Sequence, residues 1–341
     1  MLLVLFSLSL FTENEKTMQR RLKGLLLFFI LFTFSTLVHS QNTMKIPPYL
    51  KKGDTVGILA TARKIDMAPL QPAINLLKGW GLNVVVGKTV GLDNHQLAGA
   101  DWQRATDFQE MIDNPSIKAI WCAKGGYGTV RMIDRVDFTK FKKNPKWFIG
   151  FSDATVLHSH INNMDIATLH SIMCISVPRA TPDAIETFRK ALFGEKLSYK
   201  IAPHAFNKTG KVTGELVGGN LSVLYSIIGS RSEVDVKDKI LFIEDLDEYL
   251  YHVDRMMMNL KRNDYFKNVK GIIVGGMSSM NDNDIPWGHD ALEIIQDITK
   301  DYNIPICFNF PAGHTADNRA LVLGQEITLE VTAGGTTVVF K

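Results

Sequence analysis

Short apolar runs alternate with helix-like segments along the first half of this 341-residue chain. The apolar runs are 52–60, 82–86, 117–123 and 147–151. Apolar residues recur at helical spacing in the segments between them, which are 69–80, 101–113 and 129–136. Continuous apolar strands alternating with helices are typical of a parallel sheet covered on both faces. The pattern therefore predicts an α/β domain over 45–175, whose working residues gather at the carboxyl ends of the strands.

After residue 175 the pattern changes. Residues 176–210 carry prolines and charges, and we expect them to be a linker. A second α/β domain is predicted over 211–341. Its expected elements are a glycine-rich segment followed by a helix at 214–228, strands at 240–244, 271–275 and 304–309, and helices at 253–261 and 290–299. The last two apolar runs, 327–331 and 336–340, flank Gly334-Gly335 and predict a closing β-hairpin.

The N-terminal 40 residues have a different character. Residues 1–11 are almost wholly apolar, and a second apolar run at 25–38 follows three basic residues. This order is typical of a secretory signal peptide, here beginning at Met18 and cleaved after Ser40. It predicts an exported protein, periplasmic or secreted. A retained anchor is the alternative, although the second run is short for a bilayer span of about 20 residues.

Composition narrows the function classes. The chain is 45% hydrophobic and 21% charged, with a formal net charge of +3, and its mature part has no long basic run. Nucleic acid is therefore not an expected partner. Three sparse cysteines do not make a disulfide framework and are expected to be buried thiols. Since neither H-E-x-x-H nor C-x-x-C occurs, a metallohydrolase is disfavoured, and neither a metal nor a cofactor is expected.

A serine stands at a predicted strand-to-helix transition. The run 147–151 passes through Gly150, and Ser152 directly precedes a helix-like segment. Such a turn can present a hydroxyl in front of backbone N–H groups. The spacing resembles the G-x-S-x-G elbow, but Ala154 replaces the second glycine. A serine after a strand is more often a helix N-cap, so this segment alone leaves both interpretations open.

The glycine loop at 124–128 also follows a predicted strand. Its glycines allow backbone N–H groups to approach a ligand closely. One interpretation is an oxyanion hole, formed by the N–H groups of Gly126 and Asp153. A simple tight turn is the alternative. Phosphate binding is weakly supported because the loop lacks both the Walker and the G-x-G-x-x-G spacing.

A base and an orienting acid have candidates further along the chain. His314 follows a predicted strand and lies between a glycine and polar residues, which makes it the best-placed histidine for base chemistry. Glu244 ends another predicted strand and could orient a histidine, although acids at strand ends are usually solvated. His170 follows a strand-like segment at 166–169 and could line the same cleft. His158 and His160 are two apart on a predicted helix and make a poor metal pair.

Together these segments resemble the LD-carboxypeptidases of serine peptidase family S66, which also contains the microcin C immunity proteins. The likeness extends over nearly the whole mature chain from residue 52. The motifs that carry it are Gly125-Gly126-Tyr127-Gly128, Gly150-Phe151-Ser152-Asp153-Ala154-Thr155, Gly218-Gly219-Asn220-Leu221, Glu244-Asp245 with Glu248, Tyr251, Asp254 and Arg255, and Gly313-His314 with Asn318.

The resemblance implies a Ser–His–Glu triad. Ser152 would be the nucleophile, His314 the general base and acid, and Glu244 the residue that orients the imidazole. Gly126 and Asp153 would donate backbone N–H groups to the oxyanion. The resemblance also implies two domains, the first flavodoxin-like, with the site between them, and a homodimer.

The implied reaction is hydrolysis of the amide before the terminal D-alanine of a peptidoglycan tetrapeptide, through an acyl-enzyme. Two alternatives stay open. One is an amidase of the microcin C immunity type acting on aminoacyl-adenylate analogues, and the other is a non-catalytic muropeptide-binding protein. Many relatives have His-Gly-Pro-Met where this chain has His170-Ser171-Ile172-Met173, a difference that could reshape the cleft wall.

Overall fold

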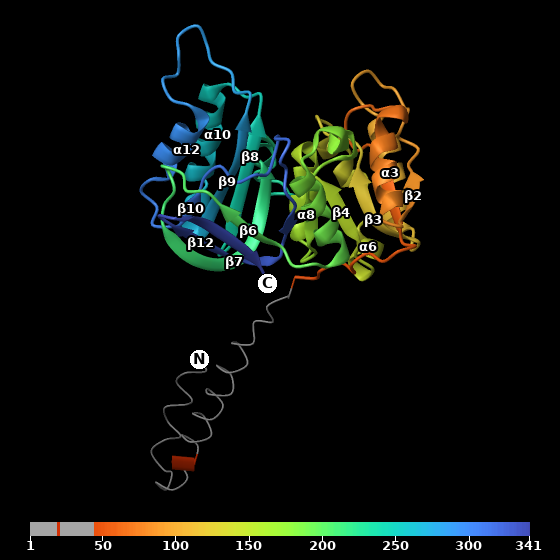
Figure 1. Cartoon of the computed structure of the whole chain (residues 1–341), viewed down its shortest axis with the longest axis horizontal. Coiled ribbons are helices and arrows are strands. Elements are labelled where there is room, and N and C mark those ends of the chain that lie inside the picture. The colour runs from red at the N-terminus through yellow and green to blue at the C-terminus, as the bar shows by residue number, and fades with distance from the viewer. Residues whose placement is uncertain (1–18, 21–43) are drawn as a thin grey trace, which may run out of the picture. The chain divides into compact units, whose positions relative to one another are not determined.

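The computed structural model describes residues 19–20 and 44–341 (Figure 1). Most of the predicted signal peptide, including Met18 and Ser40, lies outside the described residues. Residues 44–341 build two α/β lobes, each around its own sheet. The predicted two-domain α/β fold is therefore confirmed. Within the described part of the chain, no helix is both long and apolar enough to cross a membrane.

The first sheet has six strands in the order β11-β5-β4-β3-β1-β2. Its parallel strands are β1 (Thr55–Leu59), β2 (Asn83–Val86), β3 (Ile117–Cys122), β4 (Trp147–Gly150) and β5 (Thr168–His170). Its antiparallel edge strand is β11 (Leu321–Leu323). The helices of this lobe are α3 (Gln71–Gly79), α4 (Asp101–Asp113), α5 (Thr129–Met132), α6 (Thr139–Lys143), α7 (Thr155–Asn162) and α8 (Pro182–Phe193), with short 3-10 helices η1 (Ala68–Leu70), η2 (Ile133–Arg135), η3 (Ser152–Ala154) and η4 (Cys174–Arg179).

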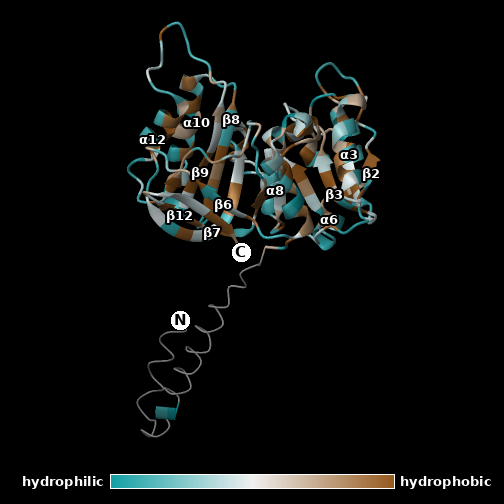
Figure 2. Ribbon diagram, in the orientation of Figure 1, coloured by the Kyte–Doolittle hydropathy of each residue, from teal (hydrophilic) through white to brown (hydrophobic). Residues whose placement is uncertain are grey.

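Helices cover both faces of the first sheet, as predicted. Trp121 of β3 packs in one core cluster with residues of α3 and α8. Its neighbour Ile120 packs in a second cluster with residues of α4, α6 and α7. Successive strand residues point to opposite faces, so an almost wholly buried strand such as β3 serves both clusters. Figure 2 shows the hydrophobic residues concentrated along the strands and on the inner sides of the helices.

The second sheet has seven strands in the order β10-β9-β8-β7-β12-β13-β6. The parallel half comprises β7 (Gly210–Asn220), β8 (Ile240–Leu246), β9 (Gly271–Ser278) and β10 (Ile306–Cys307). The antiparallel half comprises β12 (Glu326–Thr332), β13 (Gly335–Phe340) and β6 (Ser198–Ile201). The helices are α9 (Leu221–Ser226), α10 (Leu250–Arg262), α11 (Tyr265–Asn268) and α12 (Ala291–Thr299). The predicted closing hairpin is β12–β13.

The predicted linker, 176–210, is more than a connection. It contains most of η4, helix α8 and strand β6. The Thr181 side chain caps α8 by accepting a hydrogen bond from the Ala184 N–H, and Gly194 ends the helix in the left-handed conformation at φ 78°. The Phe188 ring of α8 packs against the Trp121 ring of the first sheet in a tilted arrangement. This helix therefore belongs to the first lobe, and prolines at its borders masked it in the sequence.

The glycine-rich start of the second domain is a strand, β7, where the sequence predicted only glycines before a helix. Gly218 has φ 128°, and a Cβ there would lie 1.9 Å from the Phe242 carbonyl oxygen of β8. A Cβ on Gly219 would lie 2.4 Å from Thr155 Oγ1 of α7. These glycines let β7 lie close to both its neighbouring strand and the first lobe. They are therefore required by close packing and do not mark a loop.

Strand β11 falls inside the predicted second domain but pairs with β5 of the first sheet. The chain thus leaves β10 of the second sheet, adds one strand to the first sheet, and returns to the second sheet as β12. The loop between β10 and β11, residues 308–320, is consequently fixed at its two ends by different lobes. His314 lies in this loop.

Candidate active site

Ser152 occupies a strained turn between β4 and α7. Its φ is 61°, in the left-handed region that favours glycine. A serine held in this conformation directly after a strand is the geometry of a nucleophile elbow. A Cβ on Gly150 would lie 3.0 Å from the Ala154 Cβ. The turn therefore needs small residues at both positions, and Ala154 fills the place of the elbow's second glycine.

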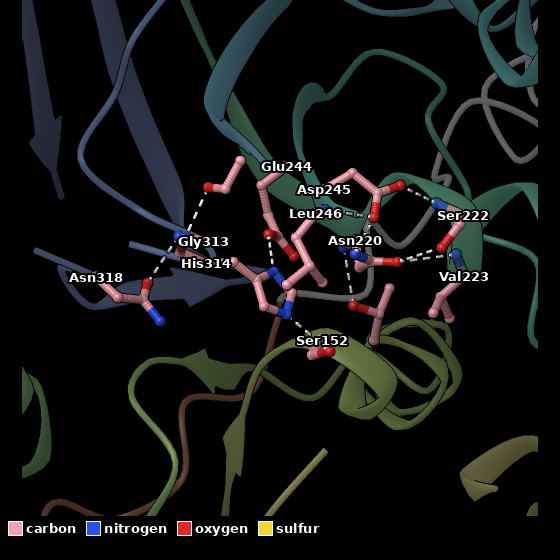
Figure 3. Close-up of polar contacts among 12 residues, drawn as sticks. Ser152, Asn220, Ser222, Val223, Glu244, Asp245, Leu246, Gly313, His314 and Asn318 are labelled. Carbon is pink, nitrogen blue, oxygen red and sulfur yellow. Dashed lines mark hydrogen bonds and ion pairs between the residues drawn. The ribbon is translucent and has the colours of Figure 1, made fainter. Parts of the chain in front are cut away.

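Three side chains predicted from separate motifs form one hydrogen-bonded row (Figure 3). Ser152 Oγ lies 3.0 Å from His314 Nε2, and Glu244 Oε2 lies 2.6 Å from His314 Nδ1. Glu244 comes from β8 and is fully buried, whereas the His314 side chain is 14% exposed. Because a carboxylate can only accept, Nδ1 carries the proton and Nε2 is free to accept the Ser152 proton.

The loop carrying His314 is shaped to bring the imidazole onto Glu244. Gly313 has φ 106°, and a Cβ there would lie 2.7 Å from Glu244 Oε2. The Gly313 N–H donates to Asn318 Oδ1 at 2.9 Å, and Ser278 Oγ donates to the His314 carbonyl oxygen at 2.9 Å. The loop is thus held from within and from β9, and only glycine fits at position 313.

Two opposed effects set the pKa of His314. Burial disfavours the imidazolium, but the charge of Glu244 and its hydrogen bond favour it, and Asp245 adds to the attraction. The net result is a pKa above the ordinary histidine value. The second carboxylate oxygen of Glu244, Oε1, is buried and has no hydrogen-bond partner in the part of the chain that the structure describes. Among the described residues, the Glu244 side chain therefore forms its hydrogen bond with the His314 imidazole.

Asp245, next to Glu244, ties β8 to β7 and α9. Its Oδ1 accepts from Asn220 Nδ2 at 2.8 Å, and its Oδ2 accepts from the Ser222 N–H at 2.9 Å. Asn220 in turn caps α9 by accepting from the Val223 N–H at 3.1 Å. Burial, and then the charge of Glu244, raise the pKa of Asp245 to about 7. In the sequence, Asn220 and Asp245 were singled out only by the family motifs.

Of the two predicted oxyanion-hole residues, Asp153 directly follows Ser152 in the chain, and Gly126 lines the same hollow as Ser152. Gly126 has φ 112° and lines, together with Ser152 and His314, a hollow of about 460 Å³. Asp153 is buried, and its Oδ2 accepts from the Thr129 N–H at 2.9 Å. Burial raises the pKa of this carboxyl. Its side chain thus holds the start of α5 behind the glycine loop, so a contribution of Asp153 to an oxyanion hole would have to come from its backbone N–H.

His170 does not line the cleft, contrary to the sequence prediction. It is fully buried, donates from Nε2 to Asn318 Oδ1 at 3.3 Å, and packs edge-on against Phe242. Burial holds its pKa well below the ordinary value, so the ring is neutral. Since Asn318 also accepts a hydrogen bond from the Gly313 N–H, His170 supports the loop that carries His314. The position of His170 at the end of a predicted strand was therefore not enough to predict that its side chain is exposed to the cleft.

Comparison with known proteins places the chain in a family. The model of the LD-carboxypeptidase N-terminal domain matches residues 56–171, and that of the C-terminal domain matches 213–329. A probable murein peptide carboxypeptidase of Bacillus subtilis (strain 168) is 35% identical over 303 residues, covering 86% of this chain and 93% of that protein. The chain belongs to the LD-carboxypeptidase family. The predicted enzyme class, a carboxypeptidase, is thereby confirmed.

Other relatives represent both branches that the sequence motifs suggested. The murein tetrapeptide carboxypeptidase of Pseudomonas aeruginosa is 26% identical over 287 residues, covering 81% of this chain and 92% of that one. The microcin C7 self-immunity protein MccF of Escherichia coli is 25% identical over 334 residues, covering 86% and 95%. The crystal structure of muramoyltetrapeptide carboxypeptidase from Oxalobacter formigenes superposes with a TM-score of 0.77 at 27% identity, covering 84% of this LD-carboxypeptidase family member and 98% of that chain.

Proposed function

We propose that this protein is a serine-type LD-carboxypeptidase that removes the terminal D-alanine from peptidoglycan tetrapeptides. The observation that carries the proposal is the row Ser152–His314–Glu244, which opens into a hollow lined by both lobes. The relatives named for murein peptides supply the substrate class. The scissile bond would join the L-centre of a diamino acid to D-alanine.

In the first half of the reaction, Ser152 Oγ attacks the amide carbonyl carbon while His314 Nε2 takes its proton. Glu244 stabilises the resulting imidazolium. The carbonyl oxygen becomes an oxyanion, which the N–H groups of Gly126 and Asp153 bind. Losing one such donor typically costs about 3 kcal/mol of transition-state stabilisation.

In the second half, the tetrahedral intermediate collapses. The carbon–nitrogen bond breaks, and the imidazolium of His314 gives its proton to the leaving amine, which departs as D-alanine. An ester to Ser152 remains. Water then attacks this ester as His314 takes one of its protons, and the proton returns to Ser152 Oγ as the acid product leaves.

The test is mass spectrometry of a tetrapeptide before and after incubation. The wild type should release one alanine, and Ser152→Ala should release none while keeping the thermal midpoint of a folded protein. Ser198→Ala, an exposed serine on the edge strand β6, is the matched control and should act like the wild type. Wild-type turnover by Ser152→Ala would refute the assignment.

The likeness to MccF supports a second candidate, an amidase acting on an aminoacyl-adenylate analogue. Incubation with an aminoacyl sulfamoyl adenosine separates the two, because only the amidase would consume it. A non-catalytic muropeptide-binding protein would bind the tetrapeptide unchanged and would not react with a serine-directed covalent probe. The assembled row Ser152–His314–Glu244 favours catalysis over mere binding.

Export and assembly belong to the same proposal. We propose that the chain is exported, with cleavage after Ser40, which brings the enzyme to cell-wall fragments. The N-terminal sequence of the protein recovered from producing cells tests this, and an intact Met1 or Met18 would contradict it. A homodimer is also proposed, and light scattering of the mature protein should give twice the chain mass.

A further inference from the structure

Two hollows meet at the catalytic row. The larger, about 460 Å³, contains Ser152, and the smaller, about 310 Å³, lies beside His314 and contains Thr315. Both hollows are lined by Phe151, Ser176, Arg179, Leu246 and His314. Ser152 itself lines only the larger one. His314 therefore borders both spaces and Ser152 only one, so a substrate bound across the row would fill the two spaces with its two ends.

The smaller hollow has one permanent charge. Of the residues that line it, Arg179 alone is always ionised, and no acid is among them. Arg179 is exposed and has no ion-pair partner among residues 44–341. Arg319, by contrast, is held by Asp317 and Asp183. Arg179 also borders the larger hollow, but three acidic residues line that space and would disfavour an anionic group there. On the side of the smaller hollow, which has no acid, Arg179 can bind an anionic ligand without first breaking an ion pair.

The chemistry assigns the two ends of the substrate to the two hollows. His314 must hand its proton to the leaving amine, so the leaving residue lies on the His314 side of the row. There the space of about 310 Å³ is ample for a residue as small as alanine. The departing residue of a carboxypeptidase substrate carries a free carboxylate, and a guanidinium binds a carboxylate through two parallel hydrogen bonds.

We propose that the smaller hollow is the leaving-group subsite and that Arg179 binds the terminal carboxylate of the substrate. This inference rests on the proposed function and names the residue that restricts cleavage to the last peptide bond. The larger hollow then holds the acyl part of the peptide. Arg63 and Lys124, which line only the larger hollow, serve as matched cations outside the subsite.

Two substrates test the subsite directly, a tetrapeptide ending in D-alanine and the same peptide ending in D-alaninamide. We expect the wild type to cleave the acid with a kcat/KM about 10- to 100-fold above that of the amide, the range of one charge-assisted contact. Arg179→Gln should lower kcat/KM for the acid by about this factor and leave the amide nearly unchanged. Arg179→Lys should keep part of the preference, and Arg63→Gln and Lys124→Gln should keep the wild-type ratio.

The possible failures are distinguishable. An unchanged acid-to-amide ratio in Arg179→Gln would overturn the inference while leaving the proposed function intact. Loss of the ratio in Arg63→Gln or Lys124→Gln would also overturn it, because the carboxylate would then lie in the larger hollow. If the wild type cleaved neither peptide, the proposed function would fall and this assignment with it. If Arg179→Gln did not fold, the ratio in Arg179→Lys decides.

Discussion

Ser152 holds a backbone conformation that opposes folding. At φ 61°, a residue other than glycine bears a cost of about 1–2 kcal/mol. Glycine avoids this cost but loses more conformational entropy on folding, by about 0.5–1 kcal/mol. Ser152→Gly should therefore be more stable than Ser152→Ala by about 0.5–1 kcal/mol. Both variants lose the hydrogen bond to His314, so that loss cancels in the comparison.

Urea unfolding of the two variants measures the difference, with a thermal midpoint shift of about 1–3 °C as the second readout. Neither variant should turn over substrate. Ala154→Gly is the control in the same turn, because Ala154 has φ −64° and is buried. It should lose about 1 kcal/mol or more. The reasoning is refuted if Ser152→Ala is as stable as Ser152→Gly, or if Ala154→Gly is stabilising.

Two further predictions concern pH. Glu244→Gln removes the charge that raises the pKa of His314, so the acid limb of the kcat/KM profile should move to lower pH while kcat falls about 10²- to 10⁴-fold; an unmoved limb would contradict this. The pKa of Asp245 is raised from 3.8 to about 7 in the folded protein, so the protonated side chain stabilises the fold below about pH 4. This contribution to the free energy of unfolding, up to about 4 kcal/mol, is lost as the pH rises through 7. Relative to the wild type, Asp245→Asn should therefore gain stability from pH 4 to pH 7 in urea unfolding, and a constant difference would show that Asp245 does not titrate in this window.

Local patterns predicted the elements whose sequence and packing agree. Helix α4 begins at Asp101 and ends at Asp113, as the apolar spacing predicts. Alternation of apolar strands and helices also predicted the first sheet. The three thiols are buried and free, as expected from their apolar surroundings.

Elements defined by distant contacts were missed. Strand β7 looks like a loop in the sequence because Gly218 and Gly219 are required by Phe242 and Thr155, residues that no local window contains. Strand β11 has only three residues and exists because β5 offers a free edge. For α8 a local signal was present, since Thr181-Pro182 and Gly194 are standard cap residues.

The site shows the same division. Spacing alone did not decide whether Ser152 is a helix cap or a nucleophile. It also did not decide whether Glu244 is a solvated acid or orients a histidine. Ser152 and Glu244 were connected with His314 only because several family motifs occur along the chain in the expected order. Arg179 belongs to none of these motifs. Its position beside the hollows and its lack of an acidic partner among residues 44–341 can be recognised only in the folded structure.

Strand β11 has a consequence for how this enzyme can move and be divided. The segment that carries His314 is anchored to the second sheet before this residue and to the first sheet after it. Separating the lobes would stretch this segment and withdraw the His314 imidazole from Ser152. We therefore expect substrate access to come from movements of side chains and surface loops rather than from a hinge between the lobes. For the same reason, a polypeptide ending near residue 210 would lack both the base and the last strand of its own sheet, and could be neither an active enzyme nor a complete domain.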